Sequence, residues 1–140
     1  DYQVAADVWS VTSFNELRKD AESVARYNRL HPKNKCKTSH VKACLGGENS
    51  PIVAATDYMK MYAEQIRQEV DAPYSVLGTD GFGRSDTREA LRDFFEVDAK
   101  MIVYTALKSL VDVGQWDVDE LLKAKKKLKI NSQRPDPDSV

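Results

Sequence analysis

Residues 52–78 read IVAATDYMKMYAEQIRQEVDAPYSVLG, and this stretch decides the fold. Ile52–Ala55 is a short, continuously apolar run, which is typical of a buried strand, and Tyr74–Gly78 is a second run of this kind. The side chains between the two runs recur at helical spacing and predict a helix to about Gln68; they are Tyr58, Met61, Tyr62, Gln65 and Ile66. A strand, a helix and a strand in this order form a crossover unit with two parallel strands, so the sequence predicts an α/β fold.

Upstream of this stretch, the sequence predicts one more strand and one more helix. Gln3–Val11 reads QVAADVWSV, which is apolar and β-branched at both ends and therefore predicts a strand. Ser13 and Glu16 have the spacing of a capping box, so we expect a helix to begin here and to run to about Tyr27. His31–Ser50 is polar and is broken by proline and glycine, so we expect mainly a long loop.

Downstream, three capping signals predict three more helices. Each signal places an aspartate where its carboxylate can accept hydrogen bonds from the first helical turn. The helices are expected to begin after Asp86, Asp98 and Asp117 and to end near Phe95, Gly114 and Leu128. The predicted class is α/β, a three-layer α/β/α arrangement with a mostly parallel sheet. Three strands are few for such a sheet, so we expect its first strand or strands and a helix to be missing.

Length and composition bound what the protein can be. The 140 residues suffice for one domain, which we assign to residues 1–130, and residues 131–140 form a polar tail expected to be disordered. The formal net charge of −1 argues against a nucleic-acid-binding protein. Apolar runs are short, and we expect no signal peptide, no membrane contact and a cytoplasmic location. Because the sequence starts at Asp1 rather than at methionine, we expect a processed protein or a piece of a longer one.

The most distinctive local feature is the glycine-rich loop Gly78–Arg88, which follows a predicted strand and opens a predicted helix. Backbone N–H groups at such a turn favour anions, and Arg84 and Arg88 could add charge-assisted bonds to a phosphate or carboxylate. The glycine order, however, is neither a dinucleotide fingerprint nor a phosphate-binding loop, and two acidic side chains oppose an anion. We therefore favour a loop that contacts a neighbouring domain over the alternative, a regulatory module that binds phosphate or a nucleotide. The expected contact residues are Asp80, Phe82, Arg84, Asp86 and Arg88.

Two further clusters carry weaker signals. Cys36, His40 and Cys44 stand four residues apart and could form three zinc ligands on a helix face, but a fourth ligand is distant, so we favour reduced cysteines. The lysine run Lys123–Lys129 is interpreted as a solvated helix face rather than as a nucleic-acid or membrane patch. The two histidines both lie in the predicted loop His31–Ser50. We therefore assign no catalytic, cofactor-binding or metal-binding residue.

Several blocks of this sequence closely resemble one known family. They are AADVWSVTSFNEL at residues 5–17, RYNRLHP at 26–32, ATDYMK at 55–60, LGTDGFGRSDTR at 77–88 and FFEVD at 94–98. The family is the carboxyl-terminal domain of the homodimeric, bacterial-type pyruvate dehydrogenase E1 component, within the transketolase superfamily. The resemblance reaches to about Leu110 and fades in the lysine-rich helix and the tail.

The resemblance implies an enzyme several times longer than this chain. In that family the first two domains bind thiamine diphosphate and Mg²⁺ between two subunits, and the cofactor decarboxylates pyruvate. The acetyl unit then passes to the lipoyl group of the E2 partner, dihydrolipoyl acetyltransferase, on the way from glycolysis to acetyl-CoA. This segment resembles the third domain, so we expect it to be inactive alone, to hold no cofactor, and to contact the other E1 domains and the second subunit. The family domain also has at least one further strand and helix upstream of the position that matches Asp1.

Overall fold

The structure is a computed structural model, and it describes residues 2–47 and 50–139. The elements in chain order are α1 (Phe14–Leu30), α2 (His40–Leu45), β1 (Ile52–Ala55), α3 (Lys60–Glu64), η1 (Arg67–Glu69), β2 (Tyr74–Leu77), α4 (Arg88–Phe94), α5 (Ala99–Asp112), α6 (Val118–Lys127) and η2 (Pro137–Ser139). The α/β class is confirmed. Among the described residues, no helix is long and apolar enough to cross a membrane.

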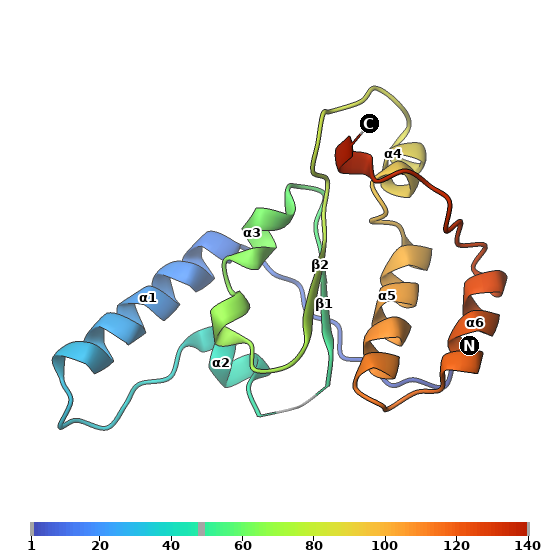
Figure 1. Ribbon diagram of the computed structural model, residues 1–140. Helices are drawn as coiled ribbons and strands as arrows, with labels where there is room; N and C mark the ends of the chain where they lie inside the picture. The colour runs from blue at the N-terminus through green and yellow to red at the C-terminus, as the bar shows by residue number, and fades with distance from the viewer. Residues whose placement is uncertain (1, 48–49, 140) are drawn as a thin grey trace.

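A small parallel sheet of two strands lies at the centre of the molecule (Figure 1). The strands β1 and β2 pair in register from Ile52 opposite Tyr74 to Ala55 opposite Leu77. Both runs were predicted, and their parallel pairing follows from the helical connection between them. Parallel strands end at the same edge of the sheet, so the loops that follow β1 and β2 emerge side by side.

Helices cover both faces of the sheet, which confirms the three-layer arrangement (Figure 1). On one face, Val41, Ile66 and Tyr74 form a buried cluster, against which α1 packs with Phe14 and Leu17. On the other face, α5 contacts both strands. A second buried cluster joins α5 to α6; it contains Leu107, Leu121 and Ala124. The sheet therefore separates two apolar clusters.

The prediction of a strand at Gln3–Val11 is wrong. The structure assigns no strand to this segment, which runs extended towards α1. Val8 is 96% exposed and Trp9 is 59% exposed, so these side chains do not cover an apolar core here. β-Branched residues favour a strand only where a neighbouring strand accepts their backbone bonds, and the segment lacks such a neighbour among the described residues.

Two boundaries in the middle of the chain also differ from the prediction. The expected loop His31–Ser50 contains the short helix α2, which Ser39 caps by accepting from the N–H of Lys42 at 3.2 Å. Residues 48–49 of that loop lie outside the described residues. The expected helix to Gln68 is divided into α3 and η1, because the chain leaves helical geometry at Ile66, which is buried in the core.

The helix caps were predicted more accurately. Ser13 accepts from the N–H of Glu16 at 3.3 Å, and Asp98 accepts from that of Met101 at 2.9 Å. Asp117 caps α6 in the same way. The cap of α4 is Thr87 rather than Asp86, because the hydroxyl of Thr87 accepts from the N–H of Ala90 at 3.2 Å.

The polar tail also differs from its prediction. Residues 131–140 were expected to be disordered; residue 140 lies outside the described residues, and residues 131–139 return to α4 and end in the turn η2 beside the loop that follows β2 (Figure 1). The guanidinium of Arg134 contacts the carboxylate of Asp93 there. Local composition did not reveal these contacts because the two residues are 41 positions apart.

Candidate functional site

Two loops meet at the carboxyl ends of the strands and form the candidate site. The first loop joins β1 to α3, and the second is the glycine-rich segment Gly78–Arg88, which we call the contact loop. Thr79 connects the two loops through two hydrogen bonds. Its N–H donates to the backbone carbonyl of Tyr58 at 2.9 Å, and its hydroxyl donates to the backbone carbonyl of Asp57 at 3.1 Å. A Cβ atom on Gly78 would lie 2.8 Å from both the backbone oxygen of Tyr58 and the backbone nitrogen of Lys60. Only glycine permits this approach.

Asp80 holds the start of α3. Its Oδ1 accepts from the backbone N–H of Lys60 at 3.0 Å, and its Oδ2 lies 3.5 Å from the ammonium group of the same lysine. Met59, at the N-cap position, supplies no side-chain hydrogen bond of its own. The contact loop therefore provides the cap that the sequence of α3 lacks.

Asp57 and Arg92 form a bidentate ion pair between the first loop and α4. The guanidinium donates to both carboxylate oxygens, at 3.1 and 2.6 Å. The hydrogen bond from Arg92 lowers the pKa of Asp57, and the charges of Arg92 and Arg88 act in the same direction. Two parallel N–H···O bonds fix the orientation of both partners, so this pair positions α4 against the end of β1.

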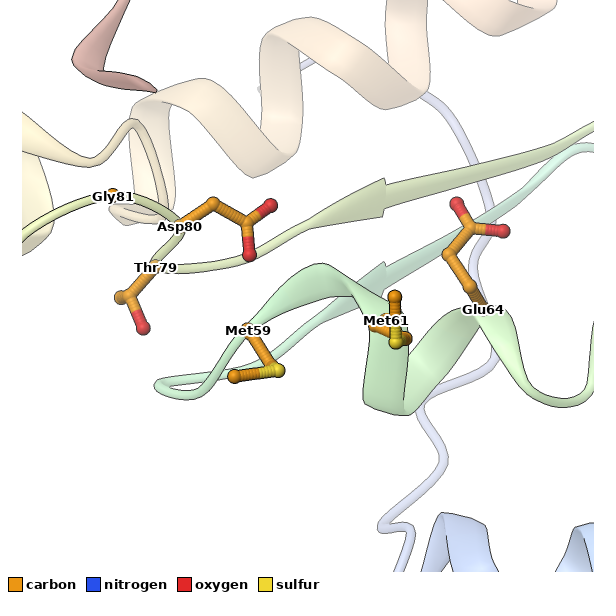
Figure 2. Close-up of a pocket in the computed structure, with 6 residues that line it drawn as sticks. All are labelled: Met59, Met61, Glu64, Thr79, Asp80 and Gly81. Carbon is orange, nitrogen blue, oxygen red and sulfur yellow. The ribbon is translucent and has the colours of Figure 1, made fainter. Parts of the chain in front are cut away.

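A shallow hollow of about 440 Å³ opens between the contact loop and α3 (Figure 2). Its lining residues come from both elements; they are Met59, Met61, Glu64, Thr79, Asp80 and Gly81. The carboxylate of Glu64 accepts hydrogen bonds from Arg67, which lower its pKa. The hollow thus combines thioether groups with carboxylates that already have cationic partners.

The predicted contact residues of the loop lie in different surroundings. Asp80 faces Lys60, as described above, whereas Phe82 is 88% exposed. The guanidinium of Arg84 lies 4.1 Å from the centre of the Phe94 ring, which is the distance of a cation–π contact.

The last two predicted residues lie at the start of α4. Asp86 accepts from the N–H of Thr87 at 2.7 Å, and Arg88 is the first residue of the helix. The structure thus brings the five residues to one end of the sheet, while their contact with another domain stays a prediction. It gives the anion-binding alternative no support, because Arg84 packs on an aromatic ring and carboxylates lie among the arginines.

An exposed apolar surface beside the contact loop was not predicted from the sequence. Its members are Tyr58, Met59, Met61 and Tyr62, and Phe82 of the loop itself is also exposed. The rings of Tyr58 and Tyr62 meet edge to face, with their centroids 4.7 Å apart. The helical spacing of Tyr58, Met61 and Tyr62 predicted a helix but not which face of it would be exposed. In the structure these three side chains are exposed, at 54%, 71% and 37%.

The cysteine–histidine cluster does not form a metal site. The sulfur of Cys44 lies 3.6 Å from Nε2 of His40, but Cys36 is exposed and does not join them. Within residues 2–47 and 50–139, no three His, Cys, Asp or Glu side chains are grouped in a way that could hold a metal ion.

The donor set at the candidate site does not fit a diphosphate bound through Mg²⁺. Such a group requires free oxygen ligands for the cation. Asp57 is held by Arg92 and Asp80 by Lys60, so the nearest carboxylates already have cationic partners.

Comparison with known proteins identifies the family. A match to the transketolase-like TK C-terminal domain covers residues 1–98. The chain belongs to this family. The family resemblance described from the sequence and the predicted α/β fold of a transketolase C-terminal-like domain are thus both confirmed.

Curated relatives of this transketolase-like domain carry one common name, "Pyruvate dehydrogenase E1 component". The protein of that name from Pseudomonas aeruginosa is 54% identical over 138 residues, which are 98% of this chain and 16% of the relative. The Cupriavidus necator protein is 46% identical over 100% of this chain and 16% of its own length. The Escherichia coli K12 protein is 46% identical over 98% of this chain and 15% of its own length. The chain thus spans about one-sixth of the length of these relatives.

Proposed function

We propose that this transketolase-like domain belongs to a pyruvate dehydrogenase E1 component, a thiamine-diphosphate-dependent enzyme. That enzyme decarboxylates pyruvate and reductively acetylates the lipoyl group of E2. The observation that carries the proposal is the 54% identity to the Pseudomonas aeruginosa protein over 98% of the chain. Identity at this level along almost the whole chain favours a shared role over a shared fold alone.

We further propose that the segment serves structure and assembly rather than chemistry. The carboxylates at the candidate site are engaged by Lys60 and Arg92, which supports a positioning role for them. Thiamine diphosphate and Mg²⁺ would then be held elsewhere in the longer enzyme. The proposed partners are the remaining E1 domains, a second E1 subunit in a homodimer, and E2 through the parent enzyme in the cytoplasm.

The contact loop and the exposed apolar surface beside it are the proposed interface. Phe82 projects from the loop with 88% of its surface exposed, and Tyr58 and Met61 extend the apolar area over α3. Contiguous exposed apolar side chains mark protein interfaces more often than free surface. Arg84, held against Phe94 of α4, adds a cation to the loop.

The test is the substitution Arg84→Ala in the full-length protein that contains this chain. We expect the dimer dissociation constant to rise about five- to tenfold, because an interfacial arginine is lost. The rate of pyruvate decarboxylation per assembled dimer should stay unchanged. Sedimentation at several protein concentrations measures the first quantity, and a standard decarboxylation assay measures the second.

Two controls make the result specific. Arg84→Lys keeps the charge and should raise the dimer dissociation constant less than Arg84→Ala does. Arg29→Ala removes an exposed arginine from α1 and should leave the dimer dissociation constant unchanged. An unchanged dimer and unchanged melting in Arg84→Ala would contradict the assignment of the loop. Calorimetric heat on adding inorganic phosphate that disappears in Arg84→Ala would favour the anion-binding alternative instead.

A further inference from the structure

The tail, residues 131–139, is attached to the body of the protein at two separated points. At the first, Arg134 donates to the backbone carbonyl of Asp93 at 2.5 Å and pairs with the carboxylate of the same residue. This aspartate also pairs with Lys100 of α5, and hydrogen bonds from both cations lower its pKa. The attachment therefore joins the tail to α4 and α5 at once.

The second attachment is at the contact loop. The carboxylate of Asp138 lies 3.6 Å from the ammonium group of Lys60, and the same ammonium lies 3.5 Å from Oδ2 of Asp80. Lys60 thus stands between one carboxylate of the tail and one of the loop. The backbone N–H of Lys60 also donates to Asp80. We therefore expect a substitution at any of these three residues to weaken the contacts of the other two.

The tail also touches the loop through its backbone. Gly81 has a φ of +92°, and a Cβ atom built on it would lie 3.2 Å from the carbonyl oxygen of Pro137. The same Cβ atom would lie 3.6 Å from Cα of Asp138. Glycine at this position therefore permits both the turn of the loop and the close approach of the tail.

The tail is shaped for this contact by its own bonds. Asp136 accepts from the N–H of Asp138 at 3.0 Å, and its carbonyl accepts from both the N–H and the hydroxyl of Ser139, at 2.9 and 2.8 Å. Pro135 and Pro137 fix the φ angle on either side of Asp136. A segment with few alternative conformations loses little entropy when it docks.

We propose that residues 131–139 form a strap that fixes the contact loop in the conformation seen here, with Arg134 and Asp138 as its two fasteners. Each ion pair alone is partly exposed and weak. Because Arg134 and Asp138 lie on one short segment, formation of either ion pair keeps the partners of the other ion pair close together, at a high effective concentration. The strap is a property of this chain and does not depend on the proposed assembly role.

Amide hydrogen exchange of the 140-residue protein tests the strap. The variants are Arg134→Ala, the nearly isosteric Asp138→Asn, and a chain that ends at Ile130. We expect exchange of the Lys60 and Thr79 amides, which hydrogen-bond to Asp80 and Tyr58 where the contact loop meets α3, to accelerate about three- to tenfold in the first two variants and more in the third. Exchange in α5 should stay within twofold, which would show that the fold is retained.

Gln133→Ala is the matched control, because only the backbone N–H of that residue makes a described bond, to Asn131 at 2.9 Å. It should leave the loop unchanged. Unaltered exchange of the Lys60 and Thr79 amides in all three test variants would overturn the proposal. Equal acceleration in the loop and in α5 would also overturn it, since the tail would then stabilise the whole fold rather than the loop. Neither readout depends on dimer formation, so the strap and the proposed interface can fail separately.

Discussion

Replacement of Gly78 by alanine should destabilise the protein through a collision between two backbone segments. The added Cβ atom would lie 2.8 Å from the backbone oxygen of Tyr58, 2.8 Å from the backbone nitrogen of Lys60, and 2.9 Å from Cγ of Lys60. Two of these three atoms belong to the main chain and cannot rotate away. The two loops must therefore separate, or the carboxyl end of β2 must shift.

The magnitude follows from what the separation breaks. Overpacking in a close contact costs about 1–3 kcal/mol. Separation also lengthens the bonds from Thr79 N–H to Tyr58 and from Lys60 N–H to Asp80, now 2.9 and 3.0 Å, each worth about 1 kcal/mol. Because a shift of the loops relieves part of the collision, we expect a total loss of about 2–4 kcal/mol. For a chain of this length that loss lowers Tm by roughly 6–12 °C.

Urea unfolding followed by circular dichroism measures the loss, and Gly83→Ala is the matched control. Gly83 lies in the same loop, yet a Cβ atom there meets nothing within 4 Å. This control should be neutral or stabilising by up to about 1 kcal/mol, because alanine restricts the unfolded chain. If Gly78→Ala unfolds at the same urea concentration as the wild-type protein, the close approach of the two loops is refuted.

Two further predictions concern the core and a helix cap. Tyr74 is 8% exposed and donates to the carbonyl of Ala63 at 2.8 Å; burial, aided by the charge of Glu64, raises its pKa to about 12. The contribution of Tyr74 to stability should therefore be fully present below about pH 10 and be lost as the pH rises towards about 12. The reason is that this tyrosine loses its proton at a lower pH in the unfolded chain than in the folded protein. Tyr74→Phe should abolish this dependence in urea titrations at several pH values, at a cost of about 1 kcal/mol at neutral pH. Asp98→Ala should lower the free energy of unfolding by about 1 kcal/mol, whereas Asp98→Asn should lower it much less, because asparagine can also cap a helix. Equal losses for the two variants in urea titrations would contradict the capping role.

The elements that could be predicted are those fixed by neighbours in the sequence. Helix caps such as Ser13 and Asp98 bond to N–H groups three residues away, so the signal and its partner lie in one short window. The strands β1 and β2 are short apolar runs joined by a helical segment, and this order fixes their parallel pairing. The segment 3–11 has a strand-like composition but no neighbouring strand in the described chain, and its own sequence could not show that.

The candidate site depended on contacts between distant residues, so less of it could be predicted. The loop Gly78–Arg88 was identified from its glycines, which report backbone conformation directly. The partner of Asp57 is Arg92, 35 positions away, and nothing in either local sequence indicates the pair. The cap of α3 comes from Asp80, 20 positions away, while Met59 at the N-cap position supplies no side-chain hydrogen bond.

The division of the core by the sheet has a consequence for how the molecule opens. The cluster around Val41 and Ile66 lies on one side of the strands, and the cluster around Leu107 and Leu121 lies on the other. Each cluster is closed by its own helices, so thermal fluctuations can loosen one side while the other stays packed. We therefore expect the protein to open as two cooperative units, one on each side of the strands. A cavity introduced on one side should weaken protection from exchange there before it weakens the opposite side.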